Sequence, residues 1–410
     1  MKGFAATQGI ISSLKGRNFR YLMFADILDG VAEQMEFVVL AWFVLTQTDS
    51  PFLVGVYGAL RYGGTLFSPF YGIIADRYNR KKILLLVRSG FVFLAIYLLF
   101  LSLSDRLVIW QVFVITGIFG CVRGFDGVMR DTILPDLLVN SATLSNAVGL
   151  NRMARDATQM IGPIVAGLML SKVGTSETYV VIIVIYISAV LILNLLNPKL
   201  QGTIDSTKSV LGDISLTIKY INRQKAVLSI LLICILVNVT AFPTNQGLLP
   251  VFARDVLGTG SAGLGILLAM FSTGALLGSI VVALSSKLKN PGKYFIFGTL
   301  AWHFAIFLLS QSKSFGLSIP LLLAAGVAQS LTMVILTIML LRVVVPELRG
   351  RVLGIRHLAV YGLLIGILIS GAMADTWDAP VALLVNSLTG IVVVVLMQVS
   401  GLLRQLFALR

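Results

Sequence analysis

The chain has 410 residues, of which 57% are hydrophobic and only 12% are charged. A soluble domain carries about 45–50% apolar and about 25% charged residues, so the composition excludes a soluble globular protein and predicts an integral membrane protein. The formal net charge of +14 leaves a nucleic-acid or anionic-lipid partner open until the distribution of the charges is known.

Apolar runs separated by polar and turn-forming residues predict an all-α membrane protein with 12 transmembrane helices in two halves. The N-terminal half, residues 19–197, has spans at 19–45, 52–75, 82–103, 107–131, 143–170 and 178–197. The C-terminal half, residues 226–400, has spans at 226–253, 262–286, 293–311, 316–344, 352–374 and 379–400. A polar linker at 198–225, which we expect to contain a short amphipathic helix, joins the halves, and 1–18 and 401–410 are cytoplasmic ends.

The first span contains four carboxylates, although a membrane helix tolerates almost none. Their spacing of 3, 4 and 3 residues places them within roughly 80° on one helix face: Asp26, Asp29, Glu33 and Glu36. Each charge at the bilayer centre costs at least about 2.5–3.5 kcal/mol, so this stripe must face other helices or water. We expect a functional interior, with buried ion pairs as the purely structural alternative.

Arginines at matching depths offer counter-charges to this stripe. The hairpin of the first two spans puts Glu36 level with Arg61, and we predict a salt bridge between them. By the same reasoning Arg123 lies level with Arg152. The same layer, or the next helical turn, also contains Asp26, Asp29, Asp126, Arg155 and Asp156.

The tally for the first half is six intramembrane acids against four bases, namely Arg61, Arg123, Arg152 and Arg155. About two carboxylates then lack a counter-charge, and burial favours the protonated form of such a group. A site that carries protons across the membrane needs this property. Glu33 is our first candidate, because it lies midmost without an evident partner, and Asp29 is the second. If water or further pairs neutralise the excess, the stripe is structural.

The loop after the second span, "GIIADRYNRKK", resembles the signature loop of the major facilitator superfamily, G-x-x-x-D-R-x-G-R-[RK]. Asn79 replaces the usual glycine, and asparagine tolerates a left-handed turn. The resemblance implies that the Asp and Arg of this loop pair with a neighbouring helix and stabilise the outward-facing state. The matching residues form a cytoplasmic gate motif: Gly72, Asp76, Arg77, Arg80 and Lys81.

Two longer segments, "AWFVLTQTDSPFLVG" from Ala41 and "VPELRGRVLG" from Val345, narrow the resemblance. They are similar to the transmembrane secretion effector, or drug:proton antiporter-3, branch, which includes macrolide-efflux and enterobactin-export permeases. This resemblance implies a monomeric exporter that moves a small-molecule substrate through the lipid bilayer, using the proton motive force and no cofactor.

Two shorter motifs bear on the direction of transport. "RGFDG" in the fourth span resembles R-x-x-Q-G, whose arginine is assigned to proton transfer, but Asp126 replaces the glutamine. "TQMIGPIVAG" in the fifth span resembles the antiporter motif G-x-x-x-G-P-x-x-G-G at Gly162, Pro163 and Gly167. Thr158 and Ala166 replace two of its glycines. Helix packing alone would also select the retained glycines.

The second half repeats the first at an offset of 210 residues, which predicts two pseudo-symmetric six-helix halves. "GVYGALRYGGTLFSPFYGIIAD" from Gly55 aligns with "GILLAMFSTGALLGSIVVALSS" from Gly265, so that Gly64 meets Gly274. The second half carries few charges but several polar groups that suit an amphiphilic ligand or helix–helix hydrogen bonds: Asn238, Asn245, Gln246 and Gln329. Pro243 predicts a bend in the seventh span.

The inside loops collect about 24 of the 32 lysines and arginines, which is the positive-inside pattern of a chain with both termini cytoplasmic. The outside loops keep Arg106, Lys172, Arg254 and Lys313. We therefore expect a multi-pass protein of the cell inner (plasma) membrane. We expect no nucleic-acid partner, because no soluble basic face is interleaved with aromatics.

These observations favour proton-coupled efflux of a lipophilic or amphiphilic molecule, such as a drug, secondary metabolite or siderophore, by alternating access. A metal-ion or lysolipid exporter of the same fold and a membrane scaffold or receptor remain alternatives. We expect no metal site, because His and Cys are absent near the stripe, and no enzyme, because no catalytic motif is present. The lone His303 is expected to be structural.

Overall fold

The computed structural model describes residues 16–67, 70–71, 79–134, 137, 141–197, 210–284, 290–345 and 348–407. Every regular element in these ranges is helical. Nine of the described helices are long and apolar enough to cross a membrane. They span Arg80–Leu103, Ile109–Arg130, Thr175–Asn194, Lys225–Val256, Ser261–Val282, Pro291–Ser310, Phe315–Val343, Arg351–Thr376 and Ala379–Val399.

Two further helices, α2 (Arg17–Thr48) and α7 (Ser141–Lys172), are each 32 residues long. They are not among the nine because charged and polar side chains lower their hydropathy. α3 (Pro51–Gly63) continues into a 3₁₀ turn at Gly64–Phe67. The segments that the sequence marks as most polar for a span are therefore helical, and the carboxylates of α2 belong to the site described below.

Contacts between residues divide the chain into two compact units. Unit 1 contains Met1–Gln47, Leu60–Asp205 and Gly260–Gly265. Unit 2 contains Thr48–Ala59, Ser206–Thr259 and Ile266–Arg410. The helix α9 (Val210–Arg223) lies within the predicted linker and packs against α10 (Lys225–Thr240) and α15 (Arg349–His357). The boundaries predicted for the halves, linker and tails stay predictions, and residues 198–209 lie outside the described ranges.

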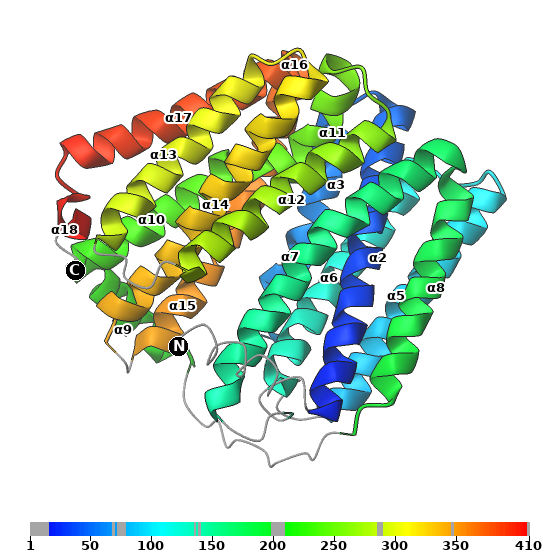
Figure 1. Cartoon of the computed structure of the whole chain (residues 1–410), viewed down its shortest axis with the longest axis horizontal. Helices are drawn as coiled ribbons and strands as arrows, with labels where there is room; N and C mark the ends of the chain where they lie inside the picture. The colour runs from blue at the N-terminus through cyan, green and yellow to red at the C-terminus, as the bar shows by residue number, and fades with distance from the viewer. Residues whose placement is uncertain are drawn as a thin grey trace. The chain divides into compact units, whose positions relative to one another are not determined.

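Within unit 1, α5 (Arg80–Leu103) packs against both α6 (Ile109–Ile133) and α8 (Thr175–Asn194), and α7 packs against α8. Figure 1 shows α2, in dark blue, running among these helices. Near one end of the unit, a buried apolar cluster includes Phe19, Leu22, Leu84, Met129 and Leu193. The carboxylates of α2 begin directly after this cluster along the helix.

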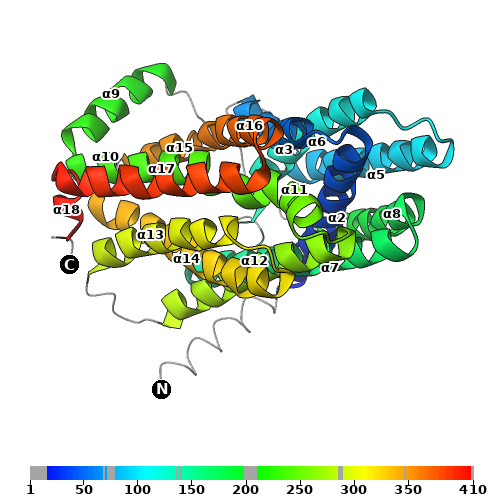
Figure 2. The same ribbon diagram turned by 90° about the horizontal axis from the view of Figure 1, so that it is seen from above.

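Within unit 2, α13 (Pro291–Ser310) packs against α14 (Phe315–Val343) and α17 (Ala379–Val399). Figure 2 shows α13 and α17 running side by side. α16 (Val360–Thr376) packs against α10 and α17. The remaining elements are α12 (Ser261–Leu284), which begins in unit 1, and the short α18 (Arg404–Phe407).

The bend predicted around Pro243 is confirmed. α10 ends at Thr240, and the Phe242 amide bonds to the Val237 carbonyl, five residues back. A wide π-type turn follows at Thr244–Leu248, then the short α11 (Leu249–Val251) and a second wide turn at Phe252–Val256. Proline has no amide hydrogen to continue the regular ladder, so the chain takes this wider path.

Glycines at equivalent positions of the predicted repeat make equivalent close contacts. A Cβ atom on Gly64 would overlap the Gly120 carbonyl of α6, and one on Gly274 would overlap the Leu323 carbonyl of α14. Both pairs bring two backbones together at a point where no side chain fits. The sequence repeat therefore coincides with a repeat in helix packing.

Candidate functional site

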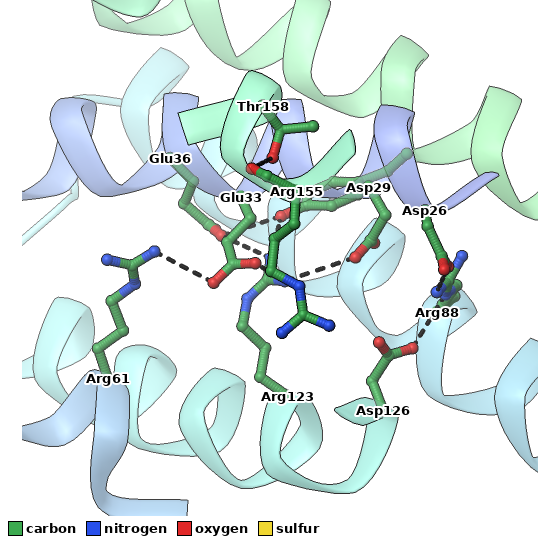
Figure 3. Close-up of polar contacts among 11 residues, drawn as sticks. Asp26, Asp29, Glu33, Glu36, Arg61, Arg88, Arg123, Asp126, Arg155 and Thr158 are labelled. Carbon is green, nitrogen blue, oxygen red and sulfur yellow. Dashed lines mark hydrogen bonds and ion pairs between the residues drawn. The ribbon is translucent and has the colours of Figure 1, made fainter. Parts of the chain in front are cut away.

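The four carboxylates of α2 lie in unit 1 and face basic side chains from α3, α5 and α6, as Figure 3 shows. They belong to two groups of ion pairs. The inner group consists of Asp26, Arg88 and Asp126, and the outer group consists of Asp29, Glu33, Glu36, Arg61 and Arg123.

Arg88 of α5 forms the centre of the inner group. Its guanidinium donates to an Asp26 carboxylate oxygen, and its Nε donates to Asp126 Oδ1 at 2.9 Å. The Arg88 side chain is only 1% exposed. Arg88 was not among the residues predicted to have a role inside the membrane. The available signal was a single arginine inside the apolar run "LLLVRSGFV", two turns into its helix.

Glu33 lies between two arginines of the outer group. Its Oε1 is 3.1 Å from Arg61 Nη2, and its Oε2 is 2.9 Å from Arg123 Nη1. The prediction that Glu33 lacks a partner is therefore wrong. The residue numbers of the hairpin predict how deep in the membrane Arg61 lies, but not which side of α2 faces it. The structure shows that Glu33 faces Arg61, where we expected Glu36.

Arg123 is the hub of the outer group. It donates to the Tyr186 hydroxyl of α8 at 2.6 Å, and this hydroxyl donates to Glu36 Oε2 at 3.2 Å. Arg123 also lies 3.6 Å from Asp29 and 3.9 Å from Glu36. Tyr186 is a second residue that the sequence analysis missed, because a tyrosine in an apolar helix gives no charge signal.

Several carboxylate oxygens of these groups have no donor. Asp26 Oδ2, Asp29 Oδ1 and Glu36 Oε1 are buried and accept no hydrogen bond from the residues that the structure describes. Arg88 Nη1 is likewise buried without an acceptor in those ranges. Buried polar atoms are normally paired, so an oxygen left in this way is a place where a proton or a ligand group can add a bond.

The two arginines predicted on α7 take different positions. Arg152 is 63% exposed and pairs with Asp156 of its own helix at 3.2 Å. This ion pair belongs to neither the inner nor the outer group. Arg155 interacts electrostatically with Glu33. Figure 3 shows the Arg155 side chain extending from α7 toward the same carboxylates.

The gate motif is described in part. Gly72, Asp76 and Arg77 lie outside the described ranges. Arg80 donates to the Thr132 carbonyl at 3.1 Å, and Lys81 donates to the Asn194 carbonyl at 2.9 Å. These bonds tie the start of α5 to the ends of α6 and α8.

The residue that replaces the motif glycine, Asn79, has an ordinary negative φ of −65°. Its side chain accepts from the Lys82 amide at 3.1 Å and caps the first turn of α5. Asparagine therefore serves here as a helix N-cap, and the left-handed turn that we considered does not occur at this residue.

The antiporter motif forms close backbone contacts within unit 1. A Cβ atom on Gly162 would overlap Gln34 of α2, and one on Gly167 would lie against Ser261 at the start of α12. Ser261 Oγ donates to the Gly167 carbonyl at 3.2 Å. Pro163 presents its carbonyl to Gly265. Thr158, which replaces a motif glycine, fits because Gly30 faces it on α2.

The polar residues predicted in the second half come from three elements, namely α10, the turn at Thr244–Leu248 and α14. Asn238 donates to the Cys234 carbonyl of its own helix at 2.8 Å. Asn245 is buried with Oδ1 unpaired within the described ranges, and Gln329 is half-buried. The Gln246 carbonyl packs against Gly58. A ligand-facing role for these residues stays a prediction.

The buried His303 bonds through both ring nitrogens. Nδ1 is 2.8 Å from the Thr299 carbonyl, and Nε2 is 2.8 Å from the Thr240 hydroxyl. Gly390 packs directly against the ring. This setting agrees with the expected structural role. Among the described residues, no three His, Cys, Asp or Glu side chains are grouped as metal ligands would be.

The sequence matches the family model described as "Transmembrane secretion effector" over residues 8–407. It is similar to the staphyloferrin A transporter of Staphylococcus aureus (strain NCTC 8325 / PS 47), with 26% identity over 272 residues, covering 66% of this chain and 67% of the relative. It is also similar to macrolide efflux protein A of Enterococcus faecalis, with 23% identity over 239 residues, covering 56% of this chain and 71% of the relative.

Solved transporters share the fold. The nucleoside transporter NupG has a TM-score of 0.71 at 13% identity and covers 93% of this chain and 98% of its own. A POT family transporter in complex with 5-aminolevulinic acid has a TM-score of 0.75 at 12% identity, covering 94% and 96%. The family match, which extends over nearly the whole chain, shows that this protein is a transporter of the transmembrane secretion effector family within the major facilitator superfamily.

Proposed function

We propose that this chain is a secondary active exporter that moves lipophilic or amphiphilic small molecules outward in exchange for protons. The observation that carries this proposal is the pair of ion-pair groups on α2, in a chain whose relatives include a macrolide efflux protein. A scaffold has no need of charged groups whose burial in a membrane protein is this costly.

The charges of the inner group favour proton exchange. One guanidinium, that of Arg88, faces the carboxylates of Asp26 and Asp126, so this group carries one negative charge when both acids are ionised. The outer group likewise has three carboxylates against the guanidiniums of Arg61 and Arg123, and the unpaired oxygens of Asp29 and Glu36 each offer a position for a proton. Carboxylates that alternate between these forms can couple proton entry to the conformational cycle.

The architecture that goes with this function has 12 transmembrane helices in two pseudo-symmetric halves, with both termini in the cytoplasm. We propose that the chain works as a monomer in the cell inner (plasma) membrane, with the proton motive force as its energy source. The concentration of lysine and arginine in the inside loops supports the orientation.

Everted membrane vesicles that contain the protein test the proton coupling. A fluorescent lipophilic substrate, such as Hoechst 33342, should accumulate when the gradient is present, and a protonophore should abolish its accumulation. Glu36→Gln and Asp29→Asn should reduce gradient-driven accumulation at least about tenfold, because each substitution removes a position that exchanges a proton.

The matched control is Glu177→Gln, which removes an exposed acid at the start of α8, outside both groups. This variant should accumulate substrate as the unaltered protein does. Accumulation that survives the protonophore, or that requires ATP, would overturn the proposal.

A further inference from the structure

Arg356 lies further from a span end than any other charged residue in the candidate spans of unit 2. It is five residues into the span Arg351–Thr376. Every other lysine, arginine, aspartate or glutamate in those spans lies within two residues of a span end. A charge inside a membrane span is costly to retain, and such residues commonly mark the path of a substrate or an ion.

The Arg356 side chain contacts two neutral groups. Its Nη1 donates to the Thr337 hydroxyl of α14 at 2.9 Å, and its guanidinium interacts electrostatically with the Cys234 thiol of α10. Among the residues that the structure describes, no carboxylate pairs with Arg356. A guanidinium has five N–H donors, and a hydroxyl and a thiol do not neutralise its charge.

Thr337 fixes the position of this guanidinium. The Thr337 hydroxyl donates to the Met333 carbonyl of its own helix at 2.9 Å. Because its hydrogen is used in that bond, the hydroxyl can only accept from Arg356. Both Thr337 and Arg356 are partly exposed, so a molecule from outside the helix packing can reach the guanidinium.

The helix is interrupted directly after Arg356. α15 ends at His357, and α16 begins at Val360. Across the interruption, the amides of Leu358 and Ala359 bond to carbonyls only three residues back. Interrupted helices at membrane depth are tolerated where they are buried in protein or line a cavity, and they commonly form the substrate sites of transporters.

The helices that surround Arg356 contain no acid. α14 packs against both α10 and α15, and none of the three has an aspartate or a glutamate. At the repeat offset of 210 residues, they correspond to α6, α2 and α7 of unit 1. There α2 and α6 carry the carboxylates of the two ion-pair groups. The corresponding helices of the two units therefore favour ligand groups of opposite charge.

Polar side chains continue from Arg356 toward the middle of two spans. Asn238 follows Cys234 by four residues on α10, and Gln329 precedes Thr337 by eight residues on α14. Residues at a spacing of four lie on one side of a helix. Amide groups in such positions can bond to the polar atoms of an amphiphilic ligand whose charged group is held at Arg356.

We propose that Arg356 binds the anionic group of the exported molecule, and that Thr337 is a positioning residue that holds the guanidinium for it. The ligand class is an amphiphile with a carboxylate or another oxyanion, because a guanidinium pairs with these groups through two parallel N–H···O bonds. That this ligand is exported rests on the function proposed above. Its binding is an equilibrium property that needs no proton gradient.

The headgroup of an anionic lipid offers the same oxyanion chemistry. The exported molecule is favoured because Asn238 and Gln329 extend the polar row toward the middle of the spans, where a lipid has only its acyl chains. The experiment below distinguishes the two sources.

The test is equilibrium dialysis of 2-naphthoate, an aromatic carboxylate, against the full-length protein in phosphatidylcholine nanodiscs, with protein-free nanodiscs as background. Arg356→Gln should weaken binding at least about tenfold, because it removes a charged, paired contact. Arg356→Lys should recover only part of the affinity, because an ammonium keeps the charge but loses the paired bonds. The matched control is Arg342→Gln, which removes an exposed arginine at the end of α14 and should change nothing.

Neutral 2-naphthamide separates charge from shape, since it has the same ring system. Its affinity should be equal in the unaltered chain and in Arg356→Gln. Thr337→Val should weaken 2-naphthoate binding about threefold, because the guanidinium loses the bond that positions it. Thr337→Ser, which keeps the hydroxyl, should restore the affinity, and neither substitution should change 2-naphthamide binding.

Three results would overturn the proposal. They are unchanged 2-naphthoate binding in a normally folded Arg356→Gln, an equal loss for 2-naphthamide, and no saturable binding of 2-naphthoate by the unaltered chain at millimolar concentration. Thermal unfolding of each variant checks the fold.

Native mass spectrometry provides the lipid arm of the test, with protein taken from nanodiscs that contain phosphatidylglycerol. The unaltered chain and Arg356→Gln should retain this lipid equally. Retention that is lost in Arg356→Gln would assign the guanidinium to a lipid headgroup and overturn its role in substrate binding. Gradient-insensitive export in the vesicle assay would overturn the proton coupling alone, so the two proposals fail by different measurements.

Discussion

At the scale of single residues, Arg88 compensates two carboxylates that come from different helices, Asp26 on α2 and Asp126 on α6. All three side chains are buried. A buried ion pair gives little net stability compared with a well-packed apolar group, but loss of one partner leaves an uncompensated charge. The main contribution of Arg88 to stability is therefore that it keeps two buried carboxylates from being left without a counter-charge.

We predict that Arg88→Met lowers the free energy of unfolding by about 3–5 kcal/mol, because it leaves Asp26 and Asp126 facing each other without a counter-charge. The triple variant Asp26→Asn/Arg88→Met/Asp126→Asn should lose less than Arg88→Met alone. Denaturant unfolding of the purified protein in detergent measures both values.

Arg152→Met is the matched control, because Arg152 is mostly exposed and pairs with Asp156 along one helix. It should change the free energy of unfolding by less than about 1 kcal/mol. A triple variant less stable than Arg88→Met would show that Arg88 does not act by neutralising these two acids.

The residue scale also shows what the sequence could predict of the site. The 3-4-3 spacing correctly predicted a buried or partly buried stripe on α2 with arginine partners from α3 and α6. The partners of individual acids could not be assigned, because hairpin arithmetic gives depth and the pairing also depends on helix rotation. That is why Arg61 was assigned to Glu36 and the structure pairs it with Glu33.

At the scale of elements, direct contacts between the backbones of two elements, at positions occupied by glycine, decide how closely the elements approach each other. The 3₁₀ turn after α3 lies against α6 at Gly64 and Gly120, where a single added methyl group would overlap backbone. The neighbouring Gly63 has no atom within 4 Å of the position that a Cβ would take. Two adjacent glycines thus have opposite tolerance for the same substitution.

We predict that Gly64→Ala destabilises the protein by about 1–3 kcal/mol or more, because the backbones of the turn and α6 must separate to admit the methyl group. Gly63→Ala should leave stability unchanged or raise it by up to about 1 kcal/mol, because alanine favours the helix. Thermal unfolding of both variants under identical conditions measures the difference. Equal effects of the two substitutions would contradict the close contact.

Elements could be predicted from the sequence where an apolar run was long or where a helix-breaking residue interrupted it. Examples are the bend at Pro243 and the helices that begin at Arg80 and Phe315. The wide turns at Thr244–Leu248 and Phe252–Val256 were not predictable in kind. A proline shows that the regular ladder must stop, but the packing of neighbouring helices decides which wider turn replaces it.

At the scale of the whole molecule, the distribution of charge fixes the expected orientation in the membrane. Arg106, in the short connection after α5, is expected outside, and Arg223, at the end of α9, is expected inside. Both side chains are exposed in the structure, so each position can report which side of the membrane it occupies.

We predict that a membrane-impermeant maleimide labels the Arg106→Cys variant in intact cells, because the distribution of lysine and arginine predicts that this position faces outward. The Arg223→Cys variant should be labelled only after the cells are permeabilised. The native Cys121 and Cys234 are replaced by serine in both variants, so each has a single reactive thiol. Labelling of Arg223→Cys in intact cells would reverse the orientation.

The ion pairs of α2 have a consequence for biosynthesis. The ribosome completes the four carboxylates of α2 before Arg61, Arg88 and Arg123 exist, so the nascent helix meets the membrane without any of the bases that later neutralise it. At about 2.5–3.5 kcal/mol for each central charge, α2 alone is a poor insertion substrate. We therefore expect the stable integration of α2 to depend on α5 and α6, so that the first several helices insert cooperatively.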